Sequence, residues 1–322
     1  DNNADHMAIA DAIKDYGGIA TMYQTSFYGF KNYECKTNTD IMFHFSKFDS
    51  EMNQSLGSNN SYNIVTGLIT DYIGKDSYTI AVETRNKLKS AGAKNIVNIM
   101  DENCSFDPRW HTGPELQIEN YSIILQKLLE TPWLGVVFKP KKVSTLKQKL
   151  EPINDLLLSA IKTGRCIILD ESGSHVSNIS PILGSMIADV SVHGHLFAGT
   201  AALECALFGG KTILIDREGA MSSKLYELSK EDVIFNNWND AIEEIIKYFK
   251  NDNANPKFGD WSTFIKAYNP FQDNNGAYRM ATYIQNLLNG FERGMDRETI
   301  MANVAQQYAD RWGYNMVIEN TV

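Results

Sequence analysis

Residues 187–216, IADVSVHGHLFAGTAALECALFGGKTILID, contain a complete strand–helix–strand unit. The apolar run at 188–194 predicts a buried strand, and the small and apolar residues at 201–209 predict a helix. KTILID at 211–216 predicts a second strand, separated from the helix by two glycines. Strands alternating with helices in this way favour an α/β fold, in which helices cover a parallel sheet.

The same alternation continues on both sides of this unit. Strands are predicted at 94–100, 133–140 and 165–170, with helices at 118–130 and roughly 145–163 between them. A further helix is expected within 177–187. A short strand-like segment at 232–237 and a helix at 239–250 follow the unit. About five parallel strands with intervening helices predict a doubly wound domain.

The two ends of the chain have different patterns. A helix at 5–16 precedes strands at 19–24, 40–45 and 62–67, whereas residues 251–275 read as loop and two amphipathic helices follow. We therefore expect three parts. Residues 1–75 form the C-terminal part of a Rossmann-like domain, residues 76–255 form a complete one, and residues 256–322 form a helical tail that packs back across both. Because three strands are too few for a complete domain, we expect more chain before Asp1.

The composition argues against several classes of protein. The 322 residues are 43% hydrophobic and carry a formal net charge of -9, which disfavours general binding of nucleic acid. No apolar run approaches the ~20 residues that cross a bilayer. The four cysteines are far apart and form no CxxC pair, so we expect no structural zinc site and a reducing, cytoplasmic environment. GxSxG, HExxH, Walker and GxGxxG motifs are also absent from the sequence.

The start of the 201–209 helix is a candidate phosphate-binding site. The first turn of a helix offers free backbone N–H groups and the positive end of the helix dipole. Gly199 allows a ligand to approach the backbone, and Thr200 can cap the helix and donate to a phosphate oxygen. Glu204 lies on about the same helix face as Thr200 and could accept hydrogen bonds from ribose hydroxyls. The alternative for Glu204 is a solvated helix charge.

Other polar residues lie at the ends of the predicted strands. His193 and His195 flank a glycine, and either one could donate a hydrogen bond or a positive charge to a departing nucleotide. A metal pair and a purely structural role are the alternatives for these histidines. Lys139 could neutralise phosphate at the same sheet edge. Ser174 lies in a polar loop and could contact base or ribose, although loop polarity alone explains it equally well.

The first part of the chain contributes three further candidates. Gln24 and Thr25 follow the strand at 19–24 and could contact an acceptor or a donor molecule. His6, near the start of the chain, is a candidate catalytic acid or base.

Three stretches together resemble a known family. The segments IATMYQTSFYGF (19–30), DIMFHFSKFDSEM (40–52) and YNIVTG (62–67) are similar to the end of the N-terminal domain in GT-B-like glycosyltransferases of bacterial capsule and lipopolysaccharide synthesis. FKPKK (138–142) together with 188–216 resembles their donor-binding domain, and NPFQDNNGAYRMATYIQNLL (269–288) resembles a tail segment of some members. The chain departs from the family pattern where Gln24-Thr25-Ser26 replaces Gln-His-Gly, where Lys141 replaces a histidine, and where Gly199 replaces a serine.

The resemblance implies a fold and a set of residue roles. It implies two Rossmann-like domains, with the 1–75 region on the acceptor side and the 76–255 region binding a nucleotide-sugar. Gly199, Thr200 and Ala201 would hold the donor phosphate, Glu204 the ribose, and Lys139 would line the site. Gln24 would lie across the cleft. The family usually needs no metal, so we expect neither a metal nor another cofactor.

The predicted function is transfer of a sugar from a nucleotide-activated donor to a surface-polysaccharide or lipid-linked acceptor. His6 and His195 are the candidate catalytic residues. The protein would act in the cytoplasm, with the inner face of the membrane or a larger complex as alternative places of action. A nucleotide-sugar 2-epimerase and a non-catalytic nucleotide- or carbohydrate-binding module remain the alternatives.

Overall fold

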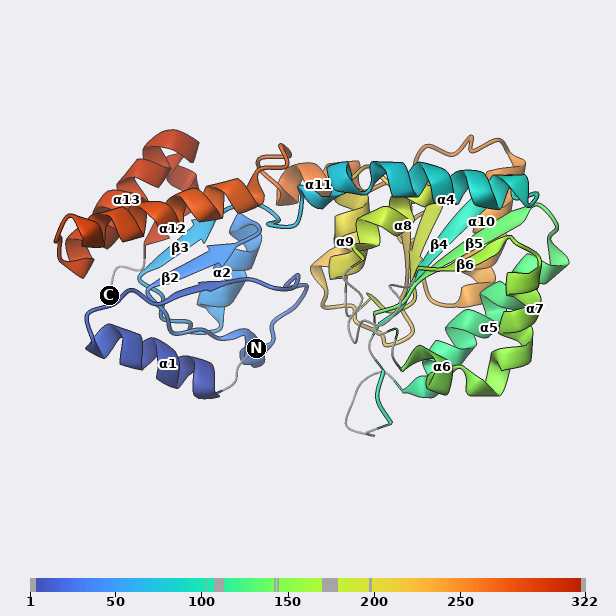
Figure 1. Cartoon of the computed structure of the whole chain (residues 1–322), viewed down its shortest axis with the longest axis horizontal. Helices are drawn as coiled ribbons and strands as arrows, with labels where there is room; N and C mark the ends of the chain where they lie inside the picture. Colours follow the sequence, from blue (N-terminus) through green and yellow to red (C-terminus); the bar gives the residue numbers. More distant parts are fainter. Residues whose placement is uncertain are drawn as a thin grey trace. The chain divides into compact units, whose positions relative to one another are not determined.

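The computed structural model describes residues 4–102, 104–106, 113–141, 143, 145–169, 179–196 and 199–319. The chain divides into two units (Figure 1). The second unit spans Ile73–Phe264, and the first combines the chain up to Tyr72 with the chain from Ile265 onward. The sequence placed the corresponding boundaries at 75/76 and 255/256.

The second unit is built on a parallel sheet with the strand order β6-β5-β4-β7-β8-β9. Its strands are β4 (Asn95–Met100), β5 (Leu134–Lys139), β6 (Cys166–Ile168), β7 (Val190–His193), β8 (Thr212–Ile215) and β9 (Ile234–Phe235). The doubly wound α/β prediction is therefore confirmed. The short segment at 232–237 forms a sixth strand beside the five expected.

Helices cover both faces of this sheet because its strands are apolar on both sides (Figure 1). The helices are α3 (Ile73–Asp76), α4 (Tyr78–Ser90), α5 (Pro114–Glu130), α6 (Leu146–Lys149), α7 (Asn154–Lys162), α8 (Pro181–Ile187), α9 (Thr200–Leu207) and α10 (Trp238–Lys250). On β5, Val136 packs in one core with α5, α7 and α10, whereas the next residue, Val137, packs in another with α4 and α8. This alternation places one hydrophobic core on each face.

The predicted long helix at 145–163 is wrong, because the structure breaks it into three pieces. Helix α6 ends at Lys149, a short 3-10 turn occupies Glu151–Ile153, and α7 begins at Asn154. Pro152 lies in the middle of the turn. A proline ring lacks a backbone N–H and clashes with the preceding helical turn, which accounts for the break.

The first unit has a smaller sheet with the order β1-β2-β3-β10. Its strands are β1 (Thr21–Tyr23), β2 (Ile41–His44), β3 (Tyr62–Val65) and β10 (Val317–Glu319). The first three are parallel, as predicted, and β10 pairs antiparallel with β3. Strand β10 was not predicted, because a three-residue edge strand is too short to show a period in the sequence.

The tail completes the core of the first unit. Helices α12 (Gly276–Glu292) and α13 (Arg297–Trp312) lie against the sheet, where Tyr283 and Tyr308 pack with Ile41, Phe43 and Ile64 (Figure 1). This unit also contains α1 (Ala4–Asp15), α2 (Lys47–Ser55) and two 3-10 turns, η1 (Tyr33–Cys35) and η5 (Tyr314–Met316). Helix α11 (Ser262–Tyr268) lies within the stretch that the sequence interpreted as loop.

Buried Arg279 ties α12 to the end of β3. Its Nε–H donates to the Thr66 carbonyl at 2.7 Å, and its two terminal nitrogens donate to the Asp273 carboxylate at 2.8 and 2.9 Å. The guanidinium carbon lies 3.6 Å from the centre of the Phe271 ring. The NPFQDNNGAYR segment thus forms a closed cluster that fixes the tail on the sheet.

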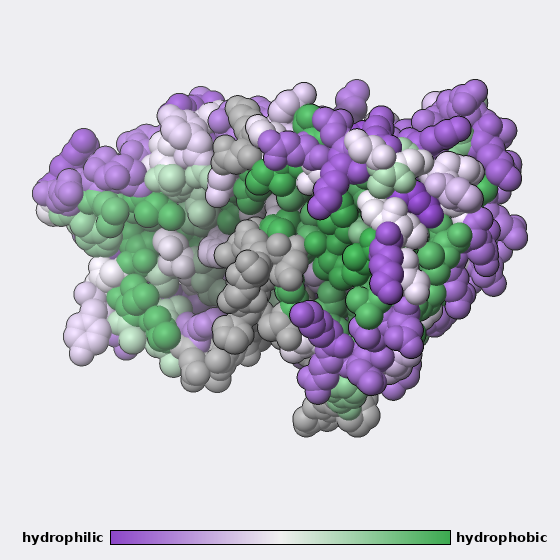
Figure 2. Space-filling model, turned by 45° about the vertical axis from the view of Figure 1, so that its right-hand side comes forward, coloured by the Kyte–Doolittle hydropathy of each residue, from purple (hydrophilic) through white to green (hydrophobic). Residues whose placement is uncertain are grey.

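The surface is mixed in character. Figure 2 shows hydrophilic and hydrophobic areas on the face that it draws. Exposed large hydrophobic residues occur in both units, among them Met7, Ile9 and Ile13 on α1 and Leu158 and Ile161 on α7. Within the described ranges, no helix has the length and apolar character needed to span a bilayer.

Candidate functional site

The second unit has a switch point at the carboxyl ends of β4 and β7. Strands β5 and β6 extend the sheet on one side of β4, whereas β7, β8 and β9 extend it on the other. Such a reversal opens a crevice at the carboxyl edge, which is where doubly wound sheets bind ligands. The residues that leave the strands here include Asp101 and Glu102 after β4, Lys139 at the end of β5, and His193 at the end of β7.

The charge of Glu204 acts on Lys139 at this edge. Lys139 is only 9% exposed, and burial lowers the pKa of its ammonium group, while the charges of Asp101 and Glu204 oppose that shift. Glu204 is half-buried on α9. A carboxylate that acts on a buried lysine is not the fully solvated helix charge that the sequence left open. The two residues remain predicted ligand contacts.

Asp101 forms the centre of a buried network that the sequence did not suggest. Its carboxylate accepts hydrogen bonds from Gln117 at 2.8 Å, from the Tyr121 hydroxyl at 3.0 Å and from the Lys141 backbone N–H. Burial raises the pKa of Asp101 to about 6, although these donors and the charge of Lys139 act in the opposite direction. The network fixes the loops that follow β4 and β5.

Lys141 pairs with Glu102 across the same two loops. The Lys141 side chain is 53% exposed, whereas the Glu102 side chain is 7% exposed. An ammonium group with this exposure can exchange its carboxylate partner for a ligand phosphate without first being uncovered. Lys141 occupies the position where the resemblance expects a histidine.

His193 is buried, and burial lowers its pKa to about 4. Its Nδ1 accepts the backbone N–H of His195 at 3.2 Å, so the proton of the neutral ring lies on Nε2. At neutral pH this ring can donate a hydrogen bond but carries no positive charge. The electrostatic role suggested for a histidine here is therefore limited to hydrogen bonding.

His195 has both ring nitrogens engaged by protein groups. The Oδ1 atom of Asn120 accepts from Arg217 and from the Trp238 indole, each at 2.7 Å, which fixes the orientation of the amide. The Asn120 Nδ2 group therefore donates to His195 Nε2 at 3.1 Å, and His195 Nδ1–H donates to Glu218 at 2.7 Å. Catalysis by His195 remains a prediction, and it would require one of these bonds to break.

Asn120 also explains the glycine between the two histidines. A Cβ atom at Gly194 would lie 2.6 Å from Asn120 Nδ2, so no larger residue fits beneath the amide. The two histidine rings lie nearly perpendicular, with their centres 6.5 Å apart.

Among the described residues, no group of three or more His, Cys, Asp or Glu side chains is arranged to hold a metal ion.

The start of α9 differs from the expectation in one respect. Gly199, not Thr200, occupies the N-cap position, and Thr200 is the first helical residue, followed by Ala201. The glycine provides no capping side chain, and the backbone N–H groups of this turn lie at the sheet's carboxyl edge, after β7. Ser174 lies outside the described residues, as do Phe197 and Ala198.

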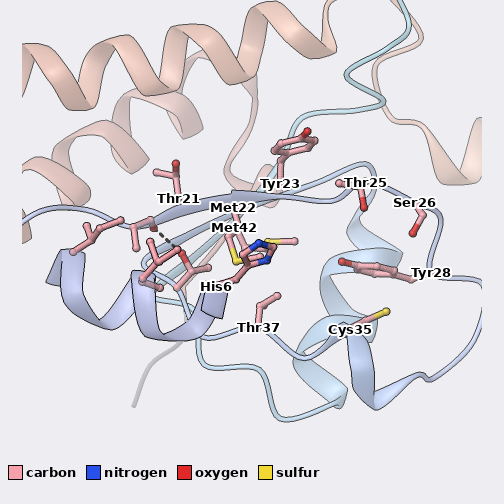
Figure 3. Close-up of a pocket in the computed structure, with 15 residues that line it drawn as sticks. His6, Thr21, Met22, Tyr23, Thr25, Ser26, Tyr28, Cys35, Thr37 and Met42 are labelled. Carbon is pink, nitrogen blue, oxygen red and sulfur yellow. Dashed lines mark hydrogen bonds between the residues drawn. The ribbon is translucent and has the colours of Figure 1, made fainter. Parts of the chain in front are cut away.

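The candidate residues of the first unit lie in two different environments. Gln24 is 1% exposed, and its amide accepts from the Phe45 N–H at 2.9 Å and donates to the Ser26 carbonyl at 2.8 Å. Its side chain thus orders the end of β1, and contact with a ligand stays a prediction. His6 and Thr25, by contrast, both line one pocket of about 400 Å³ between α1 and β1 (Figure 3).

Sequence reasoning missed the residues that act through other residues. Asp101 and Glu102 could have been found from their position directly after a buried strand. Asn120, Arg217 and Glu218 carry no such signal, because their roles depend on contacts between residues 23 to 97 positions apart.

No model of a known protein family matches the chain, and no curated protein matches it. Similar solved structures exist. One is a candidate UDP-N-acetylglucosamine 2-epimerase from Listeria monocytogenes, at 14% identity and a TM-score of 0.49 over 80% of this chain and 61% of that one. Another is the S. aureus MnaA–UDP co-structure, at 12% identity and a TM-score of 0.48 over 78% of this chain and 61% of that one. A third is the wall teichoic acid polymerase TagF, at 11% identity and a TM-score of 0.48 over 84% of this chain and 59% of that one. The chain thus spans less than two thirds of each of these structures.

Proposed function

We propose that the second unit binds a nucleotide-sugar at the switch point between β4 and β7, and that the protein transfers the sugar to a surface-polysaccharide or lipid-linked acceptor. In this proposal the chain carries parts of both domains of a GT-B-like glycosyltransferase. The phosphates lie at the start of α9, near Gly199, Thr200 and Ala201, and Glu204 holds the ribose.

One observation carries the proposal. Lys139, at the end of β5, is buried at the carboxyl edge of a parallel sheet where the strand order reverses, and the charge of Glu204 on α9 opposes the lowering of its pKa. A cation beside the phosphates and a carboxylate beside the ribose are the two charges that a nucleotide needs at such an edge. His193 adds a neutral N–H donor, and Lys141 adds a second ammonium group with half of its surface in solvent.

A thermal-shift panel of CMP, UDP, GDP, ADP and their sugar conjugates tests the proposal. A ligand at 100 times its dissociation constant stabilises the folded state by about 2.7 kcal/mol, which is readily measured. Selective stabilisation by one nucleotide and its sugar conjugate is the expected result. The absence of any shift, together with no heat of binding in calorimetry, would refute the site.

The variant Glu204→Ala locates the nucleotide. Loss of charged hydrogen bonds to ribose should weaken binding by roughly 1–3 kcal/mol, which is about 5- to 150-fold. Glu243→Ala, on the exposed side of α10, is the matched control and should leave the affinity unchanged. Equal affinity of the folded Glu204→Ala protein would remove this residue from the site.

A non-catalytic binding module is the second candidate, and the histidines favour it. Both ring nitrogens of His195 are engaged, and His193 is buried and neutral at pH 7. Nucleotide binding without release of free nucleotide from any sugar conjugate, with or without acceptor glycans, would support this module. Conversion of the bound sugar to its 2-epimer would instead identify the epimerase reaction.

We also propose that sugar transfer needs no resident metal. The ammonium groups of Lys139 and Lys141 and the α9 N-terminus would balance the charge of the leaving phosphate. Transfer activity should therefore survive dialysis against EDTA. Loss of activity on chelation, restored by Mg²⁺ or Mn²⁺, would contradict the proposal.

A further inference from the structure

The pocket of the first unit has a chemistry distinct from that of the switch point. It has a volume of about 400 Å³ and lies between α1 and the strands β1 and β2 (Figure 3). Volumes of this size hold small organic ligands, and their binding sites are mostly apolar with a few polar groups. We propose that this pocket binds the apolar chain of an uncharged amphiphile. The inference does not depend on the transfer reaction proposed above.

Apolar side chains from α1, β1 and β2 form part of the pocket lining. Ile9, Ala10 and Ile13 contribute from α1, and Met22 and Met42 contribute from the two strands. Ile9 and Ile13 are 56% and 37% exposed, so this hydrophobic surface is open to solvent in the absence of a ligand. Methionine side chains adapt readily to ligands of different shape. An apolar chain would cover surface that water now contacts.

Some hydroxyl groups of the lining already form hydrogen bonds within the protein. Thr39 donates to the Ala20 carbonyl at 2.7 Å, and Thr37 donates to Asn60 at 3.0 Å. These two residues therefore offer no free hydroxyl donor to a sugar ring. Thr25 and Ser26, at the end of β1, lie at the part of the lining where a polar head group would meet hydroxyls (Figure 3).

The lining also argues against a charged ligand. Among the described residues that line the pocket, none is Asp, Glu, Lys or Arg, and His6 is the one basic side chain. Burial raises the pKa of the Cys35 thiol and of the Tyr28 hydroxyl, so both stay protonated at neutral pH. A phosphate or carboxylate placed here would lose its hydration without gaining a Lys or Arg partner among these described residues.

A homologous series of amphiphiles tests the pocket directly. Hexyl, heptyl and octyl glucoside are titrated by calorimetry into the whole chain, below the concentrations at which they form micelles. Each buried methylene is worth about 0.8 kcal/mol, so affinity should rise about fourfold per carbon. Affinity that does not depend on chain length would overturn the proposal.

Two lysine variants on α1 locate the binding. Ile13 lines the pocket and is 37% exposed, whereas Met7 is 40% exposed on the same helix and does not line it. Ile13→Lys should weaken octyl glucoside binding at least tenfold, and Met7→Lys should leave it within twofold. Equal effects of the two variants would show that binding is not in the pocket.

A second pair of variants tests the pocket without adding a charge. Ala10 is buried and lines the pocket, whereas Ala12 is exposed on the same helix. Ala10→Phe fills part of the volume and should lower the affinity, while Ala12→Phe should not. Unchanged affinity in a folded Ala10→Phe protein would overturn the proposal.

Discussion

Replacing Arg279 should uncouple the C-terminal helices from the sheet of the first unit. The side chain is fully buried and makes three hydrogen bonds, one to the Thr66 carbonyl and two to Asp273. In Arg279→Met, the buried carbonyl loses its donor, which costs about 1–3 kcal/mol. Breaking a buried ion pair costs about 3–5 kcal/mol, but the Asp273 side chain is 35% exposed, so water compensates part of that loss. We expect a total near 3 kcal/mol.

Hydrogen exchange measured by mass spectrometry resolves this loss by segment. A loss of about 3 kcal/mol should speed exchange in α12, α13 and β3 roughly 100-fold and leave β4 and β5 unchanged. The exchange rates of Arg279→Lys should lie between those of the unchanged protein and those of Arg279→Met, because an ammonium group cannot make the paired bonds to Asp273. Arg293→Met, at the exposed end of α12, is the control. Similar exchange in Arg279→Met and in the control would refute the reasoning.

Three further changes test other contacts. Burial lowers the pKa of His44 from 6.5 to about 4. The free energy of unfolding should therefore be highest above pH 6.5 and should fall by about 3 kcal/mol as the pH drops towards 4, because the unfolded state binds the proton first. Urea unfolding should show a flatter profile over this range for His44→Gln, and an identical profile would contradict the assignment. Gly276→Ala should destabilise the first unit by about 1–3 kcal/mol in the same assay, because its Cβ would lie 2.2 Å from the Leu68 carbonyl oxygen; unchanged stability would show that α12 can shift. Asn120→Asp keeps the acceptor for Arg217 and Trp238 but removes the donor to His195, so the ¹⁵N chemical shift of His195 Nε2 should change. An unchanged Nε2 shift in this variant would contradict the hydrogen-bond assignment.

Local periodicity was sufficient to predict the second unit's sheet. Four of its strands, β4, β5, β7 and β8, are runs of four to six residues that are nearly all buried, and turn or helix signals separate them. The errors occur where a single residue or a distant partner decides the structure. Pro152 breaks one predicted helix, and β10 exists only because β3, about 250 residues earlier, offers an open edge. Neither effect appears in the hydrophobic pattern.

The two histidines show why the candidate site was harder to predict than the fold. In the sequence, His193 and His195 are equivalent, because both flank one glycine at a strand end. In the structure, the backbone N–H of His195 donates a hydrogen bond to Nδ1 of His193. The two ring nitrogens of His195 are hydrogen-bonded to Asn120 and Glu218. One ring therefore keeps a proton on Nε2, and the other is held in place by α5 and by the loop after β8. Residue type and spacing cannot separate these roles, since Asn120 and Glu218, which hold the second ring, lie 75 and 23 residues away along the chain.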